Sequence, residues 1–483
     1  MPELDEEFDL IVIGGGPSGS TVSTLVAMQG HSVLLLEKET FPRHQIGESL
    51  LPLVVHGICG MLGCLDDVHD AGFVKKYGGV FRWGSSDEPW SFTFGDAEEL
   101  KKAGVDYSYQ VERAKFDHIL LNNAKKRGVQ VRENHEVKDL IVENGRVVGA
   151  NFVDDTGTAR TARARFVVDA SGNKSQFHKY VGERVVSKFF QNIALFGYFE
   201  NAKRLPDPNR GNILCSAFEH GWMWFIPLSD TLTSVGAVVD KNHAAALQQQ
   251  DHDAAMRGFI DACPVMQDML EPATRITEGE YGKYRVRKDY SYSTTSYWTP
   301  GMALLGDAAC FIDPVLSSGV HLATYSGLLA ARSINSLLQG VHGLDEEKLF
   351  AEFENRYRYE FENIYRFLIA FYDFNRHEKS YFWEARKILD TPERDNEAFV
   401  RLVSGVSTVD MDVFSTGQRI SDLLQSYPDQ QLDEGVLRAI DHVDMAMKAK
   451  KDQVLYGKGE RQGVPDIAGG LVPTPDGYYW TTA

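Results

Sequence analysis

The segment that most constrains the fold is a glycine-rich turn between two apolar runs near the start of the chain. Residues 9–13, DLIVI, have the composition of a short buried strand, and residues 31–38, HSVLLLEK, contain a second one. Between them, the turn GGGPSG leads into STVSTLVAMQG, which is compatible with a helix. A strand, a tight turn, a helix and a second strand in this order form the βαβ unit of a parallel sheet.

The glycines of this turn have the spacing of a dinucleotide-binding loop. They follow the pattern G-x-G-x-x-G, in which the missing side chains permit a tight turn and let a pyrophosphate approach the start of the helix. Glu37 ends the second strand, where it can accept a hydrogen bond from a ribose hydroxyl. The alternative is a glycine cluster that only packs a turn against a helix, but the strand, helix and acid in register favour a dinucleotide. The predicted binding residues are Gly14, Gly16, Ser18, Gly19, Glu37 and Lys38.

Composition describes a globular protein and excludes several classes of function. Of the 483 residues, 43% are hydrophobic and 24% are charged, which is ordinary for folded domains. No apolar run reaches the roughly 18 residues that a membrane span requires, and the net charge of −18 argues against a nucleic-acid-binding surface. The acidic start, MPELDEEFDL, is unlike a signal peptide, and the five scattered cysteines lack zinc-ligand spacing. We expect a cytoplasmic protein with reduced cysteines and no bound metal.

The rest of the chain predicts a mixed α/β fold. Alternating segments with N-G and T-G turns predict hairpins over 129–169, and residues 190–240 are again strand-like. A β run at 302–314 precedes an expected helix at about 320–338. Residues from about 346 predict a helix with an apolar stripe at Leu349, Phe350, Phe353, Tyr357, Phe361, Ile364, Leu368 and Phe371.

These patterns predict three structural units. The first is a discontinuous Rossmann-like dinucleotide-binding domain, and the second is an antiparallel β-sheet domain on the substrate side, interleaved with the first. The third is a mainly helical C-terminal region that ends in a loop-like tail rich in Gly, Pro and aromatic residues. The dinucleotide-binding domain is predicted to cover 1–75, 100–190 and 285–345, and the β-sheet domain 76–99 and 191–284. The C-terminal region covers 346–483.

Further motifs resemble the FAD-binding enzymes of the aromatic-hydroxylase type. Gly306-Asp307 is similar to the signature whose aspartate binds the ribityl chain, and RFVVDASG at 165–172 resembles another signature of that family. The segments FPRHQIGESLLP and QVERAKFD also match the family pattern. By this resemblance the dinucleotide is FAD, and Arg43 and Arg113 lie near the flavin or its phosphates. The resemblance adds Arg43, Ser49, Arg113, Asp169, Gly306 and Asp307 to the cofactor site.

No second dinucleotide loop follows a strand elsewhere in the chain, so the sequence contains no evident nicotinamide domain. A protein of this kind needs reduced flavin from another source. We therefore expect a separate flavin reductase as a partner, or a transient contact with NADH.

Within this fold, residues 221–228, GWMWFIPL, resemble the W-x-W-x-I-P motif of flavin-dependent halogenases. Trp222 and Trp224 are two residues apart on an expected strand, so both indoles face the same side. Two such tryptophans are usually core residues, but the flavin context and the following Ile226 and Pro227 favour a wall between flavin and substrate. Such a wall would keep the substrate from being hydroxylated.

A second segment, GFVKKYGGVFRWG at 72–84, resembles the part of these halogenases that contains their essential lysine. Of the two adjacent lysines, Lys76 directly precedes Tyr-Gly and fits that position better than Lys75. The family reaction implies that reduced FAD and O2 form a flavin hydroperoxide, which chloride or bromide converts to hypohalous acid. Lys76 would then bind the hypohalous acid or form a chloramine, and burial would lower its pKa and favour the nucleophilic amine.

The loop after Asp313 is the expected halide site. It offers backbone N–H groups beside the flavin ring, in an arrangement suited to an anion. The resemblance assigns the halide to Ser318 and Gly319, and flavin contacts to Pro314, Gly319 and Val320.

One departure from the family pattern concerns the substrate. Tryptophan halogenases carry a glutamate in the loop after Asp-Pro, whereas this chain has Leu316 there. An electron-rich phenol or pyrrole activates its own ring and has less need of that carboxylate. The sequence therefore resembles more closely the halogenases whose substrate is attached to a peptidyl or acyl carrier protein. Carrier proteins are usually acidic, so the basic runs KKRGVQVR and KYRVRK are candidate docking surfaces.

Three alternatives remain open from the sequence alone. An FAD monooxygenase would add oxygen without needing halide. A flavoprotein of the geranylgeranyl reductase kind would reduce a double bond without O2, and it would have no need of the W-x-W-x-I-P motif. A non-catalytic flavin-binding protein would bind FAD without turnover.

Overall fold

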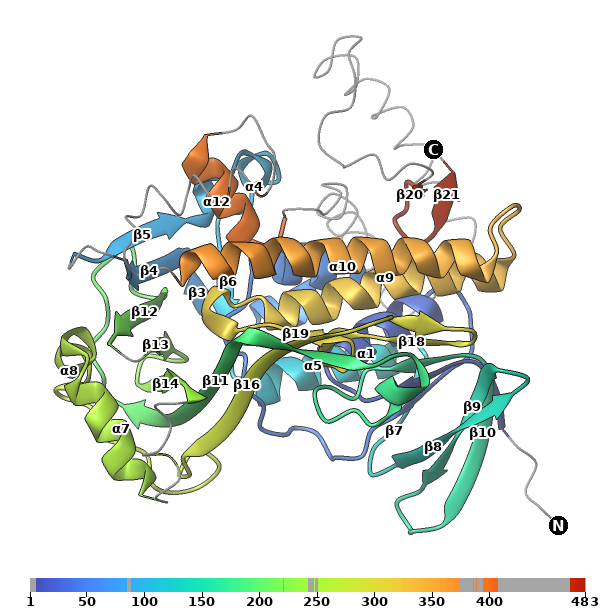
Figure 1. Ribbon diagram of the computed structural model, residues 1–483, viewed down its shortest axis with the longest axis horizontal. Coiled ribbons are helices and arrows are strands. Elements are labelled where there is room, and N and C mark those ends of the chain that lie inside the picture. Colours follow the sequence, from blue (N-terminus) through green and yellow to red (C-terminus); the bar gives the residue numbers. More distant parts are fainter. Residues whose placement is uncertain are drawn as a thin grey trace, which may run out of the picture.

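The computed structural model describes residues 6–84, 88–219, 221–241, 247, 251–372, 385, 388, 394–406 and 470–482. Two long helices, α9 (Gly319–Gln339) and α10 (Glu346–Phe371), run side by side above the first of two large β-sheets, and the second sheet extends from below them to β4 and β5 at their left end (Figure 1). The mixed α/β class predicted from the sequence is confirmed.

The first sheet contains the βαβ unit predicted at the start of the chain. Its centre is parallel, because β1 pairs with β10 on one side and with β2 on the other, and α1 (Pro17–Ala27) connects β1 to β2. The predicted hairpins over 129–169 are confirmed, since β8, β9 and β10 pair antiparallel at one edge. The strands are β1 (Glu6–Ile13), β2 (Val33–Leu36), β7 (Gln130–Arg132), β8 (Glu136–Glu143), β9 (Arg146–Val153), β10 (Ala159–Asp169), β17 (Trp298–Thr299) and β18 (Met302–Leu304).

The second sheet is mostly antiparallel and holds the strands expected over 190–240. Its order is β19-β16-β11-β14-β13-β12-β4-β5, with β15 paired to β11. Only the β12–β4 pair is parallel among its described pairings. The strands are β4 (Gly78–Arg82), β5 (Trp90–Thr93), β11 (Arg184–Glu200), β12 (Ile213–Phe218), β13 (Gly221–Pro227), β14 (Leu232–Asp240), β15 (Thr274–Arg275), β16 (Arg285–Thr294) and β19 (Cys310–Phe311).

Both faces of this second sheet are buried in its middle, which explains the nearly continuous apolar sequence of β13. Trp222, Trp224 and Ile226 belong to the main core, whereas Met223 and Phe225 belong to a second core. The second core includes residues of α7 (His252–Asp261) and α8 (Pro264–Leu270), which lie beside β13 and β14 in Figure 1. The period-two alternation of a strand thus divides one apolar run between two cores.

Helix α9 is the buried helix that joins the first sheet to the outer helix α10. It packs so closely on α1 that a Cβ built on Gly327 would lie 2.9 Å from the Cβ of Thr21. Helix α10 covers α9, and all eight residues of its predicted apolar stripe are buried. Further described helices are the π-helix Leu53–Ile58 and the α-helices α2 (Cys59–Leu62), α3 (Leu65–His69), α4 (Glu98–Lys102), α5 (Arg113–Lys126) and α12 (Asp395–Val403).

Two sequence predictions need correction. The β run expected over 302–314 is interrupted, because Gly306–Ala308 and Pro314–Leu316 form 3-10 turns and only the short strands β18 and β19 remain. The tail expected to be loop-like contains a hairpin of β20 (Leu471–Pro473) and β21 (Trp480–Thr482), which is fixed by the buried Trp480. Residues 407–469 of the predicted helical region lie outside the described residues.

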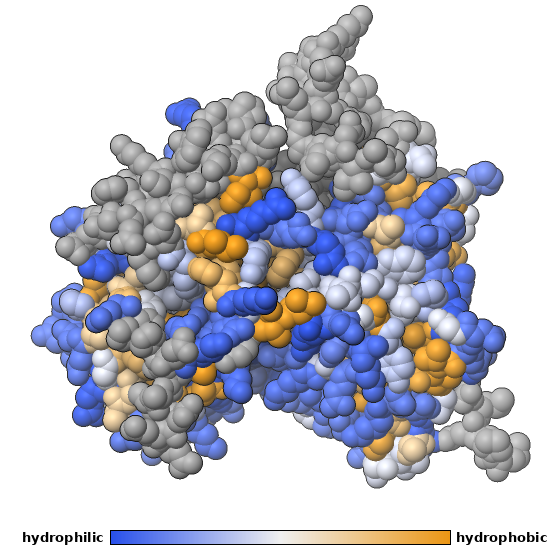
Figure 2. Space-filling view, in the orientation of Figure 1, coloured by the Kyte–Doolittle hydropathy of each residue, from blue (hydrophilic) through white to orange (hydrophobic). Residues whose placement is uncertain are grey.

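The division into domains stays a prediction. After β10 the chain leaves the first sheet, and it enters the second sheet with β11, which begins at residue 184. Strand β16 belongs with the antiparallel sheet. All five cysteines are free and buried. Among the described helices, none is long and apolar enough to cross a membrane. Hydrophilic residues cover much of the visible described surface, and apolar residues form scattered patches there (Figure 2).

Candidate active site

A cavity of about 950 Å³ opens between the two sheets. The glycine-rich turn lines one end, residues 43–49 line one wall, and β11, β13 and β16 of the second sheet line another. The loop before α9 also lines the cavity, through Pro314 and Ser317. The cavity therefore brings together most of the residues predicted to bind the cofactor.

Close packing explains two glycines of the turn, Gly14 and Gly19. Gly14 has a φ of +102°, and a Cβ there would lie 2.6 Å from the carbonyl oxygen of Ala170. A Cβ on Gly19 would lie 1.9 Å from the carbonyl oxygen of Gly14, so Gly19 serves the packing of the turn and does not line the cavity. Gly16 precedes the first residue of α1 and does line the cavity. The start of a helix is thus open to a phosphate.

Glu37 has the position predicted for a ribose ligand. It is buried, and its two carboxylate oxygens accept hydrogen bonds from the backbone N–H groups of Gly15, at 2.7 Å, and Glu39, at 2.8 Å. These bonds fix the carboxylate at the cavity wall and leave it lone pairs for a further donor. Lys38 and Ser18 line the cavity beside it.

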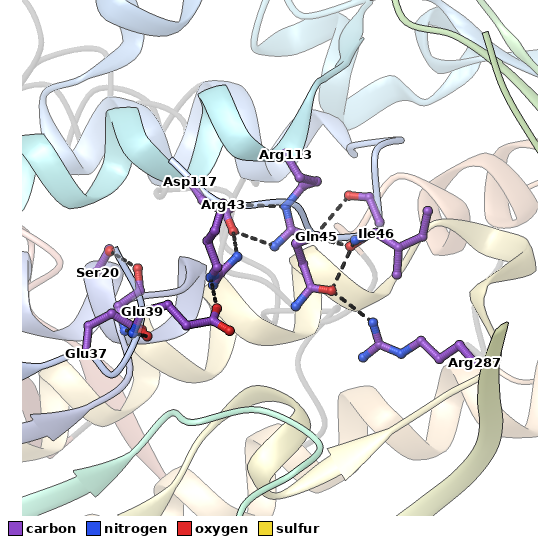
Figure 3. Close-up of polar contacts among 11 residues, drawn as sticks. Ser20, Glu37, Glu39, Arg43, Gln45, Ile46, Arg113, Asp117 and Arg287 are labelled. Carbon is purple, nitrogen blue, oxygen red and sulfur yellow. Dashed lines mark hydrogen bonds and ion pairs between the residues drawn. The ribbon is translucent and has the colours of Figure 1, made fainter. Parts of the chain in front are cut away.

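The two predicted arginines share one buried carboxylate, as Figure 3 shows. Arg113 Nε donates to Asp117 Oδ1 at 2.7 Å, and Arg43 Nη1 donates to Asp117 Oδ2 at 3.2 Å. Arg113 also donates to the carbonyl oxygens of Ile46 and Gly47. Arg113 therefore supports the wall formed by residues 43–49, and both arginines also line the cavity.

The two predicted aspartates lie in different environments. Asp307 lines the cavity, with Arg287 Nη2 at 3.8 Å from its carboxylate. Asp169 does not line the cavity. Its buried carboxylate instead accepts hydrogen bonds from the hydroxyls of Ser171 and Ser175. Asp169 therefore shapes the loop that follows β10, and burial raises its pKa.

Three residues that line the cavity have a buried polar atom that makes no hydrogen bond of normal geometry to a described residue. These atoms are Ser18 Oγ, Ser49 Oγ and Glu48 Oε2. Unpaired buried polar atoms are costly, so their concentration at one site indicates a polar ligand. Together with the open glycine turn and Glu37, these atoms fit an FAD molecule.

Both tryptophans of β13 line the cavity. Their ring centroids are 6.1 Å apart, and the indole of Trp224 lies over Gly236 of the neighbouring strand. Ile226 also lines the cavity, whereas Pro227 is buried outside it.

A buried hydrogen-bond cluster connects this wall to the expected halide loop. Trp222 Nε1 donates to Tyr372 Oη at 2.7 Å, and Tyr372 Oη donates to Asp313 Oδ2 at 2.7 Å. Asn192 Nδ2 also donates to Asp313 Oδ2, at 2.9 Å. The other oxygen of Asp313 accepts from Val315 N at 3.2 Å and so caps the turn before the loop. Burial raises the pKa of Asp313 to about 6.

The loop itself ends at the start of α9. Ser317 adopts a left-handed φ of +60°, and Ser317, Gly319 and Val320 line the cavity together with Pro314. Ser318 is buried beside them, with no hydrogen bond to its hydroxyl. The positive end of a 21-residue helix therefore faces the cavity, as an anion site requires.

Lys76 lies outside this cavity and is 2% exposed, whereas Lys75 is exposed. The Nζ of Lys76 donates to the carbonyl oxygen of Leu50 at 3.1 Å and lies 5.3 Å from the ring centre of Phe94. No described carboxylate forms an ion pair with it. Burial therefore lowers the pKa of Lys76 to about 7.

Residues 48–50 separate Lys76 from the cavity. Glu48 and Ser49 line the cavity, whereas the carbonyl group of Leu50 faces Lys76. The segment is held by β6 (Ser108–Gln110), which also pairs with β3 (Val74–Lys76). One short strand therefore positions both the separating segment and the lysine.

Sequence reasoning missed several residues that line the cavity, among them His44, Gln45, Glu48, Arg285 and Arg287. Gln45 accepts a hydrogen bond from Arg287 at 2.9 Å (Figure 3). A signal for the arginines was present, because Arg285 and Arg287 are two residues apart and therefore share one face of β16. His44, Gln45 and Glu48 lie in the segment FPRHQIGESLLP, whose resemblance to the FAD-binding family was a signal for the segment but not for these residues.

We predict that Gly236→Ala disturbs the cavity wall. The new Cβ would lie 2.3 Å from the Trp224 ring, so the indole must shift. Overpacking of this kind costs about 1–3 kcal/mol of unfolding free energy, and FAD affinity should fall because the shifted indole changes the cavity wall. A titration by flavin fluorescence measures this, with Gly258→Ala as control, because a Cβ on Gly258 meets nothing within 4 Å. Equal affinities of the two variants would contradict the packing argument.

We also predict that Lys76→Met stabilises the protein at neutral pH. The pKa of Lys76 is about 7 in the folded protein, whereas the ordinary value of 10.5 applies to the unfolded chain. The buried lysine therefore destabilises the fold most at and below pH 7. Wild-type stability should rise with pH between these values, by about 1.4 kcal/mol per unit. The advantage of the variant should therefore shrink up to pH 10.5. Urea unfolding at several pH values measures this advantage, and a difference between the two proteins that does not change with pH would refute the shift.

Comparison with known proteins agrees with this site. The model of the tryptophan halogenase family matches residues 9–105 and 97–418. The tryptophan 2-halogenase of Chondromyces crocatus is 34% identical over 420 residues, which cover 84% of this chain and 77% of that protein. The 1H-pyrrole-2-carbonyl-[peptidyl-carrier protein] chlorinase of Pseudomonas fluorescens is 30% identical over 399 residues, covering 77% and 85% of the two chains.

A solved structure gives a more extensive match. The myxobacterial chondrochloren halogenase, described as a new variant of FAD-dependent halogenases, is 53% identical to this chain. The alignment has a TM-score of 0.76 and covers 99% of this chain and 100% of the other. The chain therefore belongs to the tryptophan halogenase family and is a flavin-dependent halogenase.

Proposed function

We propose that this enzyme halogenates an electron-rich phenol or pyrrole through hypohalous acid and Lys76. The observation that carries the proposal is the position of Lys76, which is buried outside the flavin cavity and separated from it by residues 48–50. Bound reduced FAD would supply hypohalous acid from O2 and chloride or bromide. An amine beyond the cavity wall can receive this small oxidant while the organic substrate stays away from the flavin.

The electrostatics of Lys76 suit this role. Because its pKa is about 7, a large share of the amine is neutral at physiological pH. A neutral amine can be chlorinated on nitrogen, and a protonated amine can donate a hydrogen bond to hypohalous acid. Both routes direct electrophilic halogen toward an aromatic ring beside Nζ.

The binding residues have separate roles in this proposal. The glycine turn with Ser18 holds the pyrophosphate, Glu37 and Lys38 hold the adenosine end, and Asp307 holds the ribityl chain. The loop of Ser318 and Gly319 holds the halide at the start of α9, which favours an anion. The indoles of Trp222 and Trp224 exclude the substrate from the flavin.

Leu316 bears on the substrate. Leu316 is buried. Because its side chain is a hydrocarbon, it supplies no carboxylate to assist attack on an unactivated ring. One relative is named for tryptophan and another for a pyrrole attached to a carrier protein. We propose the carrier-attached class, because a phenol or pyrrole does not need the missing carboxylate.

Docking of a carrier protein on the two basic runs stays a prediction, although some of their side chains also have contacts within the chain. In the first run, Lys125 and Lys126 pair with Glu133 and Asp67. Residues 285–288 of the second run line the flavin cavity. A separate flavin reductase remains the proposed source of reduced FAD.

The proposed reaction predicts opposite outcomes for the two adjacent lysines. Lys76→Met should abolish halogenation, because the amine that directs the halogen is lost, while FAD affinity stays unchanged. Lys75→Met is the matched control and should retain activity, since Lys75 is exposed. The assay supplies a flavin reductase, NADH, FAD, air and chloride or bromide, and product isotope patterns are measured by mass spectrometry. Addition of a single oxygen to the product would instead identify a monooxygenase.

The substrate class predicts a preference for the attached form. Tyrosyl and pyrrolyl groups bound to a carrier protein should be halogenated faster than the corresponding free acids and free tryptophan, because docking raises the local substrate concentration. Competition between bound and free substrates, followed by mass spectrometry, measures the ratio of kcat/KM. Equal or better use of a free substrate would refute the carrier assignment.

A further inference from the structure

Glu48 is a buried carboxyl group in the cavity wall to which the reaction proposed above gives no role. Its side chain is 2% exposed, and burial raises its pKa to about 7. Arg113 on one side lowers this pKa, and Glu112 raises it. The group can therefore both hold and release a proton near neutral pH.

One oxygen of Glu48 ends a series of hydrogen bonds. Tyr198 Oη donates to Glu48 Oε1 at 2.8 Å, and His44 Nε2 lies 2.7 Å from the same Tyr198 oxygen. Because the single hydroxyl proton of Tyr198 points to Glu48, His44 Nε2 must be the donor in its bond to Tyr198. Both protons therefore point toward Glu48, from the half-exposed His44 through the buried Tyr198.

The carboxyl group of Glu48 has a second polar neighbour, the hydroxyl of Ser234. Oε2 is buried and makes no hydrogen bond of normal geometry, although Glu48 lines the cavity. The hydroxyl of Ser234 faces the carboxyl group and lowers its pKa, and it accepts a hydrogen bond from Trp224 Nε1 at 3.2 Å. The carboxyl group thus lies beside the indole wall.

The charges around His44 keep it neutral. Burial and the guanidinium groups of Arg285, Arg113, Arg43 and Arg287 lower its pKa to about 4. A neutral imidazole has one N–H and one free nitrogen, so it can release a proton on one side and accept one from solvent.

We propose that His44, Tyr198 and Glu48 form a proton relay from the cavity rim to its interior. The inference rests on the proposed function, in which reduced flavin, O2, halide and one proton give oxidised flavin, hypohalous acid and water. Glu48 releases its Oε2 proton to the oxygen that leaves as water. The Tyr198 proton then moves to Glu48 Oε1, the His44 proton moves to Tyr198, and solvent reprotonates the imidazole. No electron moves along the relay.

The first test uses the full chain without FAD and reads the protonation of Glu48 by infrared spectroscopy. A protonated carboxyl band should titrate near neutral pH, shift in D2O and disappear in Glu48→Gln. Tyr198→Phe should move this band to higher frequency, because the hydrogen bond to Oε1 is lost. Tyr281→Phe is the matched control, since the Tyr281 ring lies 4.3 Å from the Tyr198 ring but its hydroxyl donates to Glu112. Absence of a titrating band that depends on Glu48 would overturn the relay.

The second test measures single-turnover halogenation with reduced FAD supplied in excess. Tyr198→Phe should slow product formation roughly 100-fold, as expected for loss of positioned proton transfer, whereas Tyr281→Phe should behave like wild type. Equal rates for the two variants would also overturn the relay. If wild-type protein forms no halogenated product, the proposed function fails, and the infrared result alone decides whether the relay exists.

Discussion

The arrangement of the site depends on the hydrogen bonds that hold residues 48–50 against β6. Leu50 N donates to the carbonyl oxygen of Tyr109, and Val111 N donates to that of Glu48. These bonds place two side chains in the flavin cavity and turn the Leu50 carbonyl toward Lys76. A backbone segment of this kind is a thin and rigid wall, since its position is fixed by paired backbone groups and not by flexible side chains.

Buried titratable groups lie on both sides of this wall. Lys76 is on one side and Glu48 on the other, and burial moves the pKa of each to about 7 from opposite directions. Asp313, near the halide loop, shows the same effect with a pKa of about 6. Perturbed groups that cluster around one cavity are typical of enzyme active sites. The fold tolerates them because neighbouring hydrogen bonds compensate part of the cost of burial.

The sequence predicted those parts of the site that follow from local geometry. The spacing of Gly14, Gly16 and Gly19 predicted the turn, and a Cβ at Gly14 or Gly19 would indeed lie too close to a backbone oxygen. The alternation in GWMWFIPL correctly placed both indoles on one face. The sequence did not show that Asp169 would bind the serines of its own loop.

By itself, the sequence determined the βαβ unit, the dinucleotide loop, the strand face that carries the tryptophans and, through the resemblance, the halogenase family. Those features depend on residues close together in the chain, where periodicity and backbone sterics decide the structure. Only the tertiary structure decided that Glu48, Tyr198 and His44 form one hydrogen-bonded series, and that Lys76 lies behind residues 48–50. These contacts join segments far apart in the chain, and burial, which sets the pKa values of Glu48 and Lys76, is a property of the packed fold.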